Sequence, residues 1–259
     1  MSAPITTLLI KELRDATGIS VMQCKRALIE AEGDMKKALA ILKKTSSDIA
    51  LKKADRETKD GAVTVKEGKG KSVLVSLHCE TDFVSKNSDF TALLESLADK
   101  AFTKGVLEMK KEAKEMIDPV IQKTGENIEL GDAYEVAGEV LGSYIHNGKI
   151  GVIVSLLGGN QELAKDIAMH TAAMKPEYIS STDISEDARK TVTEIFQKEV
   201  ASVDKPEEIK KKMLLGKLTT YFKEKTLLEQ PFVKNPDETV GKLLEKAKAK
   251  IKEVKRYSI

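Results

Sequence analysis

Two short hydrophobic runs with nearly the same sequence place the strongest constraint on how this chain folds. Val73–Leu77 reads VLVSL, and Val152–Leu156 reads VIVSL 79 positions later. In each case a strand-like segment and a turn precede the run, and hydrophobic residues at helical spacing follow it. A strand hairpin that continues into a helix is one unit of an α+β fold. The repeat therefore predicts two related subdomains, each with an antiparallel sheet and a helix.

The first subdomain is expected to begin with a β-hairpin. Residues 61–66 and 71–79 alternate between apolar and polar side chains, with a glycine-containing turn between them. Two helices are expected next, at 90–101 and 106–117. Pro119 is expected to interrupt the second helix, because proline cannot donate a backbone hydrogen bond.

The second subdomain is expected to be entered through one long strand. The alternating pattern runs from Tyr134 to His146, and Asn147-Gly148 is a strong signal for a tight hairpin turn. Residues 149–157 would return as the partner strand. Further along, residues 240–247 are read as a last helix and residues 251–259 as a terminal strand.

Helical segments are expected on either side of these strands. Residues 5–44 read as three short helices, which must pack together because none is long enough to be stable alone. They suggest a bundle that resembles the ubiquitin-associated fold. Residues 184–226 read as a charged antiparallel helical hairpin. The expected N-caps are Thr6 or Thr7, Ser20 and Asp34. Helical spacing turns several apolar side chains inward, among them Leu8, Val21, Leu39, Ile195 and Ile209.

These patterns predict an α+β fold in three parts. Residues 1–54 form the three-helix module, residues 55–140 the first core subdomain, and residues 141–259 the second core subdomain with the inserted helical hairpin. The segment 44–60 is charged and carries few large apolar side chains, so it is read as a linker with the boundary near Ala54.

Composition limits the partners and the cellular compartment. The formal net charge is only +2 over 259 residues, which gives no reason to expect direct binding of nucleic acid or a membrane. The two cysteines, Cys24 and Cys79, form no CxxC pair, and this usage fits a reducing cytosol. Residues 1–10 do not read as a secretory signal, and no apolar run approaches the length that spans a membrane. The chain is therefore expected to be cytoplasmic.

The three histidines leave few routes to covalent catalysis. His78 and Cys79 are neighbours in a predicted strand, so their side chains point to opposite faces and cannot form a nucleophilic pair. His170 lies on the apolar stripe of a helix and is read as a core residue. No spacing of His and Cys matches a metal site, so no metal, cofactor or enzymatic chemistry is expected. His146, beside Asn147-Gly148, reads as a turn residue.

The segment Glu80–Asn87 joins the predicted strand to the predicted helix and contains a carboxylate next to an aromatic residue. Two readings of Asp82 and Phe83 remain open on the residues alone. Asp82 could lie in the N-cap region of the helix while Phe83 enters the core. Alternatively, both side chains face outward, and a partner that buries the ring stabilises the complex by roughly 1.5–3 kcal/mol.

Two stretches resemble signatures of the bacterial elongation factor Ts family. Leu77–Lys86 reads LHCETDFVSK, with Glu80 where the family commonly has glutamine. Leu13–Leu28 resembles a second signature, although Val21 replaces a commoner methionine. The order of the predicted segments agrees with the family along essentially the whole chain.

The resemblance implies a function and a partner. Members of this family exchange the guanine nucleotide on the translational GTPase elongation factor Tu, binding its GDP-bound and nucleotide-free states. By this resemblance, Thr81, Asp82, Phe83 and Val84 would enter the GTPase and dislocate its Mg²⁺ ion. Further contacts to the GTPase would come from Arg14, Val21, Met22, Thr124 and His146.

Two other functions stay open as alternatives. The lysine-rich segments 43–53, 210–212 and 242–255 would suit a ribosome- or RNA-associated binding protein, although acidic residues are interleaved with the lysines in much of them. A hydrolase with Cys79 as its nucleophile is the other alternative, and it would lose its activity on Cys79→Ser.

Overall fold

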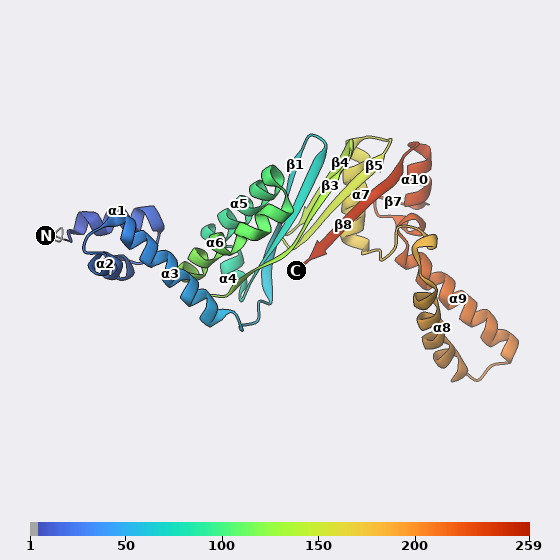
Figure 1. Cartoon of the computed structure of the whole chain (residues 1–259). Helices are drawn as coiled ribbons and strands as arrows, with labels where there is room; N and C mark the ends of the chain where they lie inside the picture. The colour runs from blue at the N-terminus through green and yellow to red at the C-terminus, as the bar shows by residue number, and fades with distance from the viewer. Residues whose placement is uncertain (1–4) are drawn as a thin grey trace.

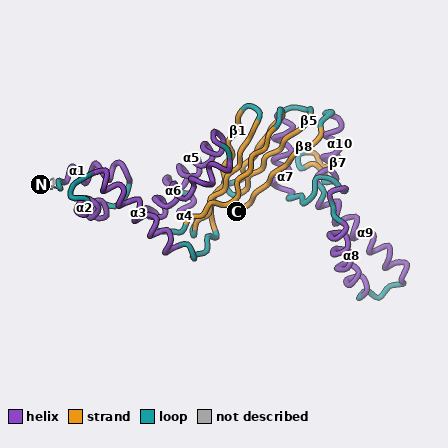
Figure 2. Tube along the Cα trace, in the orientation of Figure 1, coloured by secondary structure: helices purple, strands orange, loops and turns teal. Residues whose placement is uncertain are grey.

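The computed structural model describes residues 5–259 and shows an elongated molecule with the sheets at its centre (Figure 1). A three-helix module lies at one end, and a projecting pair of helices lies at the other. Figure 2 shows that the strands gather in the middle and that the helices flank them. The predicted α+β class is confirmed.

The first sheet has the strand order β1-β2-β3 and is antiparallel throughout. Its strands are β1 (Asp60–Gly68), β2 (Lys71–Cys79) and β3 (Ile128–Ala137). The helices α5 (Ser88–Lys104) and α6 (Val106–Thr124) cover one of its faces. Alternate residues of β2 point towards these helices, where Val73, Val75 and Leu77 are buried with Phe90 and Leu97.

The second sheet has the order β4-β5-β8 and repeats this arrangement. Its strands are β4 (Val140–His146), β5 (Ile150–Leu157) and β8 (Lys250–Ser258), and α7 (Gln161–Met174) packs on its outer face. Val152, Val154 and Leu156 of β5 share a core with Ile167 of α7 and with Leu244 of α10 (Val240–Lys246). The two runs that repeat in the sequence are thus the central strands of two equivalent sheets.

The remaining faces of the two sheets pack against each other. Leu74 and Val136 of the first sheet meet Leu141 and Ile153 of the second in a separate hydrophobic cluster. Gly151 allows this close approach, because a Cβ there would lie 2.7 Å from the Cδ1 atom of Leu74. The sheets therefore form the two inner layers, and the helices form the outer layers.

The N-terminal module consists of α1 (Thr7–Thr17), α2 (Val21–Glu30) and α3 (Met35–Lys53). The side chains of Thr6, Ser20 and Asp34 accept backbone hydrogen bonds at the three N-termini, as predicted. The module has its own small core, made of Ile10, Leu13, Ile19, Cys24, Ala27, Leu28, Ala31, Ala38 and Leu42.

The prediction of a linker from residue 44 is wrong, because α3 continues without a break to Lys53. Its second half packs on α6, where Ala50 joins the core of the first sheet and the buried Ser46 hydroxyl donates to Gln122. Few large apolar residues are needed between α3 and α6, because small residues one helical turn apart, Ser46 and Ala50, let the two helices pack closely. Only residues 54–59 connect the helix to β1.

Two further predictions about element limits are wrong. Pro119 does not end α6, which runs on to Thr124, because Val120 and Ile121 remain packed in the core and outweigh the lost backbone bond. The segment 134–146 is two strands rather than one, since the chain leaves the first sheet at Gly138 and enters the second at Val140. An alternating apolar and polar sequence indicates a strand, but it does not show which sheet the strand joins.

The five side chains Leu8, Val21, Leu39, Ile195 and Ile209 are exposed, which contradicts the prediction that they point inward. Each belongs to a short bundle or to the helical pair, where one or two neighbouring helices cover only part of an apolar stripe. The helical pair, α8 (Glu186–Ala201) and α9 (Glu207–Lys225), has a single buried residue, Val200. The proposed division into three domains at residues 54 and 140 stays a prediction.

Short elements complete the second half of the chain. They are the 3-10 turns Ser181–Asp183 and Leu227–Glu229 and the two-stranded sheet of β6 (Pro231–Phe232) and β7 (Asn235–Thr239). Within residues 5–259, no helix is long and apolar enough to cross a membrane.

Candidate functional site

The segment Glu80–Asn87 is anchored at both ends and exposed in the middle. It leaves β2 at the buried Cys79, forms the single-turn helix α4 (Asp82–Ser85), and enters α5 after Asn87, whose side chain accepts from the Asp89 amide at 2.8 Å. Val84 and Ser85 of α4 are buried, so this side of the turn is fixed against the sheet. The other side of α4 faces solvent.

Phe83 lies on the solvent side of α4, with 83% of its surface exposed. The reading in which Phe83 enters the core is therefore wrong. The neighbouring Asp82 is also exposed and pairs with Lys86 at 2.8 Å, one helical turn further on. A ring and a carboxylate are thus presented together on a supported turn.

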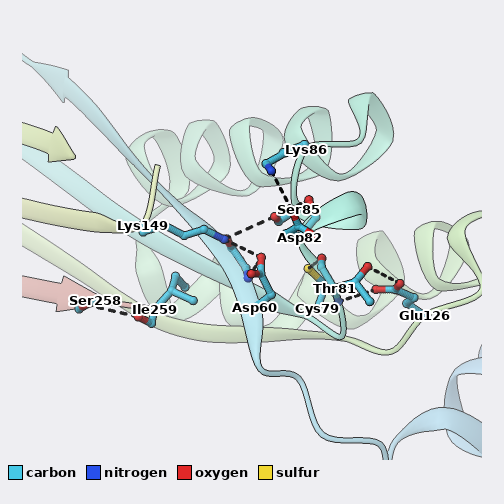
Figure 3. Close-up of polar contacts among 11 residues, drawn as sticks. Asp60, Cys79, Thr81, Asp82, Ser85, Lys86, Glu126, Lys149, Ser258 and Ile259 are labelled. Atoms are coloured by element: carbon cyan, nitrogen blue, oxygen red, sulfur yellow. Dashed lines mark hydrogen bonds and ion pairs between the residues drawn. The ribbon is translucent and has the colours of Figure 1, made fainter. Parts of the chain in front are cut away.

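The carboxylate of Glu126 holds the start of this turn. One oxygen accepts from the Thr81 amide at 3.0 Å, and the other accepts from the Thr81 hydroxyl at 2.6 Å (Figure 3). The neighbouring Glu80 reaches back in the opposite direction, where its carboxylate accepts from the Asn127 amide at 2.7 Å. These reciprocal bonds join Glu80–Asn87 to the segment that follows α6, so the conformation at Thr81 is fixed from outside the loop.

Sequence reasoning missed Glu126, which lies 45 positions from Thr81 and belongs to no recognised motif. The available signal was Glu80, the departure from the family signature, because a carboxylate there needs donors close by. Those donors are the Asn127 amide and, at 3.4 Å, the Arg56 guanidinium.

The structure brings only some of the predicted contact residues together. Thr124 ends α6 two positions before Glu126, so it lies close to the exposed turn. Arg14, Val21 and Met22 belong to the separate N-terminal module, where all three are exposed. This module touches the core near the site, since Gly18 packs closely against the Lys123 side chain. Lys123 in turn pairs with Asp89 at 3.1 Å.

His146 lies at the end of β4, beside the tight turn that Asn147-Gly148 forms with positive φ angles. Its ring is exposed, and the Tyr144 hydroxyl lies 3.1 Å from Nδ1. The side chain is therefore supported by its own strand and accessible from solvent.

The residues suggested for a thiol hydrolase do not form a nucleophilic pair. His78 points between the two sheets, where Nε2 lies 2.6 Å from the Tyr257 hydroxyl, while Cys79 points into the core under α5. Burial, reinforced by the Asp60 and Glu126 carboxylates, raises the pKa of the Cys79 thiol to about 12. Almost none of it is the thiolate near neutral pH, and the thiolate is the nucleophilic form.

His170 is a buried structural residue, as predicted. The Val233 amide donates to its Nδ1 at 3.1 Å, so the ring proton lies on Nε2 and is donated to the Gln230 side-chain oxygen at 2.9 Å. Burial lowers the pKa of His170, and the bond to Gln230 opposes that shift. In the part of the chain that the structure describes, no three His, Cys, Asp or Glu side chains group as metal ligands do.

An exposed ring beside an exposed carboxylate, on a turn fixed by buried neighbours, is typical of a surface that binds another protein. Comparison with known proteins shows which family has such a surface segment in its sequence. Residues 80–259 match the family described as Elongation factor TS. Curated relatives named Elongation factor Ts are 41% identical over 264 residues in Hahella chejuensis and 38% identical over 265 residues in Stutzerimonas stutzeri. These alignments cover 99% of this chain and 92% and 91% of the relatives.

A third relative of the same name, from Alcanivorax borkumensis, is 38% identical over 264 residues and aligns with 97% of this chain. The matched class is that of translation elongation factors. The chain belongs to the elongation factor Ts family.

Proposed function

We propose that this protein is a guanine-nucleotide exchange factor that accelerates the release of GDP from elongation factor Tu. The observation that carries the proposal is the exposure of Phe83 and Asp82 within the family's signature segment. An exposed phenyl ring gives no stability to the free protein, whereas burial in a partner would stabilise the complex by roughly 1.5–3 kcal/mol.

Phe83 would act by its volume. Its ring would be inserted between elements of the GTPase that pack together in the GDP-bound state. Val84, on the buried side of α4, and Thr81, held by Glu126, would keep the turn from yielding during the insertion. A rigid turn loses little conformational entropy on binding, so more of the burial energy remains for opening the nucleotide site.

Asp82 would act by its charge. A GTPase binds GDP partly through a Mg²⁺ ion that neutralises the phosphate oxygens. A carboxylate brought near that ion's surroundings would disturb the groups that hold it. Loss of the ion would leave the phosphate charge unbalanced, and the affinity for GDP would fall. In the free protein, Asp82 is paired with Lys86, an exposed contact that costs little to break.

Exchange of this kind follows from linked binding equilibria and needs no covalent step. The factor must bind the nucleotide-free GTPase more tightly than the GDP-bound form, or it would shift no equilibrium. Because coupling is reciprocal, incoming GTP would weaken the binding of the factor and release it. The segment Glu80–Asn87 would therefore supply contacts and charge rather than covalent chemistry.

Other surfaces would supply the grip that makes the insertion favourable. Arg14, Val21 and Met22 would dock the N-terminal module, residues 1–54, on the GTPase. Thr124 would contact it from the first core subdomain, residues 55–140. His146 would contact it from the second, residues 141–259. We assign the work to the cytoplasm, where elongation factor Tu acts.

Binding to RNA or the ribosome is the second candidate, and the side-chain contacts argue against it. Lysines from each of the three lysine-rich segments are engaged with acidic side chains, and the pairs include Lys43–Glu115, Lys210–Glu207, Lys246–Glu238 and Lys255–Glu253. These segments therefore present mixed charge to solvent rather than the uniformly basic track that binds phosphates. RNA binding that weakens steeply with salt would revive this candidate.

The test of the proposal is a measurement of GDP release. Elongation factor Tu loaded with fluorescent GDP is mixed with an excess of unlabelled GDP, with and without the full-length protein. The protein is expected to accelerate the fluorescence change in proportion to its concentration until the rate saturates. A rate that stays at its spontaneous value at micromolar protein would overturn the proposal.

A further inference from the structure

One lysine joins the two sheets at the edge where the exposed turn α4 lies. Lys149 follows the β4–β5 turn and precedes Ile150, the first residue of β5. Its ammonium group crosses to the first sheet, where it donates to the Asp60 carboxylate at 2.5 Å and to the Gly61 carbonyl at 2.5 Å. The same nitrogen lies 3.5 Å from the Ser85 hydroxyl of α4, as Figure 3 shows.

Asp60 occupies the position that makes this contact useful. It is the first residue of β1 and pairs with Cys79, the last residue of β2 before the segment Glu80–Asn87. Burial acts to raise the pKa of the Asp60 carboxyl, but hydrogen bonds from Lys149, Ser85 and the Gly61 amide outweigh it and hold that pKa below its ordinary value. The carboxylate is therefore charged when it faces the lysine.

The backbone of Lys149 is fixed independently of its side chain. Its amide donates to the His146 carbonyl at 3.0 Å, which closes the turn, and its carbonyl accepts from the Ile259 amide at 2.9 Å. The neighbouring Gly148 carbonyl accepts from the Val63 amide of β1 at 2.8 Å. The lysine thus extends from a rigid turn, and the side chain transmits that position to Asp60 and α4.

From this geometry we infer that Lys149 is a positioning residue that sets α4 relative to the turn carrying His146. The inference rests on the proposed function, since it gives Phe83 and His146 a fixed spacing for one partner surface. Glu126 holds the start of α4 from one side and Lys149 holds its end from the other, so the turn is fixed at both ends. With either contact removed, the ring of Phe83 would sample more orientations.

The ammonium group is well suited to this role. The Lys149 side chain is about two-thirds buried, with 34% exposed, and the side chain of its partner Asp60 is 25% exposed. A charged pair at this depth is screened less than a surface pair. One group also meets three acceptors on two elements, so a neutral side chain of the same length cannot replace it.

The experiment compares Lys149→Met with Lys149→Arg in the full-length protein. Lys149→Met keeps most of the length and apolar stem but removes the charge and donors. We expect amide hydrogen exchange of residues 81–87 in the free protein to become at least about threefold faster in Lys149→Met. The saturating rate of GDP release from elongation factor Tu should fall about fivefold, with a smaller change in the protein concentration that gives half the maximal rate. Lys149→Arg should restore most of both.

Lys225→Met is the matched control. Lys225 pairs with Glu177 at 2.5 Å and has the same 34% side-chain exposure, but it ends α9 in the helical pair. Its substitution should leave both measurements at the wild-type value. Should Lys149→Met fail to fold, Lys149→Gln replaces it, because a shorter, uncharged polar side chain is tolerated more easily at this partly buried site and still removes the ion pair with Asp60 and the contact with Ser85.

The possible results separate the inference from the proposed function. Unchanged amide exchange at residues 81–87 in a folded neutral variant, Lys149→Met or Lys149→Gln, would overturn the inference. The inference would also be overturned if Lys149→Arg showed the same fast amide exchange and the same slow GDP release as Lys149→Met. If exchange at 81–87 rises but neither Lys149→Met nor Phe83→Ala affects GDP release, the positioning role stands and the proposed function fails.

Discussion

The substitution Phe83→Ala separates a role in binding a partner from a role in folding. Because 83% of the residue is exposed, removing the ring opens no cavity in the free protein. Exposed substitutions away from special features change the unfolding free energy by about 0.5 kcal/mol or less. The melting temperature of Phe83→Ala should therefore stay close to that of the wild type.

The magnitude of the functional loss follows from the same exposure. Burying a phenylalanine side chain completely is worth roughly 1.5–3 kcal/mol relative to leaving it exposed. The ring of Phe83 is nearly all available for burial, so the loss is roughly 1.5–3 kcal/mol. If that energy is used in opening the nucleotide site, the saturating rate of GDP release falls about 10- to 150-fold.

The assay is stopped-flow release of fluorescent GDP from elongation factor Tu, with Leu107→Ala as the matched control. Leu107 is 80% exposed near the start of α6, outside the candidate site, and its truncation should leave the rate unchanged. The reasoning is refuted if folded Phe83→Ala gives the wild-type rate, or if Leu107→Ala slows release as much.

Three further predictions follow from buried or clamped groups. Glu126→Gln should slow GDP release about two- to fivefold, because the Thr81 amide and hydroxyl lose a charged acceptor. An unchanged rate would show that the contacts between Glu126 and Thr81 do not affect exchange. The neutral ring of His170 has a lowered pKa, so the unfolded state binds the proton more readily. The unfolding free energy should fall as the pH drops below 6.5, and His170→Gln should lack this part of the pH dependence in chemical denaturation. With a pKa of about 12, Cys79 should resist iodoacetamide at pH 8 in the native protein and react in urea, and labelling at Cys79 in the folded protein, located by peptide mass spectrometry, would contradict its burial.

Local sequence predicted the central elements because their signals are contained within a few residues. The alternation at Val73–Leu77 and Val152–Leu156 correctly marked buried strands, and Asn147-Gly148 correctly marked a tight turn. The prediction failed where tertiary packing outweighed a local preference. Pro119 is tolerated inside α6 because Val120 and Ile121 remain packed in the core, and α3 continues through Ser46, whose hydroxyl bonds to Gln122 of α6.

In the candidate site too, local sequence identified some residues and tertiary packing decided the rest. The residues Asp82 and Phe83 were found from the sequence, but two readings of the ring remained open until its exposure was known. The supports of the turn, Glu126 and Lys149, could not be found, because they lie 45 and 64 positions from the groups that they hold.

By itself the sequence determined most of the helices, the two β-hairpins, the repeat of Val73–Leu77 at Val152–Leu156, and the family. Tertiary structure alone decided that the two sheets face each other, that Phe83 points to solvent, and that Glu126 and Lys149 hold the turn from either side. The physical reason is that local patterns record only which side chains avoid water. Which distant groups meet depends on how complete elements pack, and that packing is a property of the whole chain.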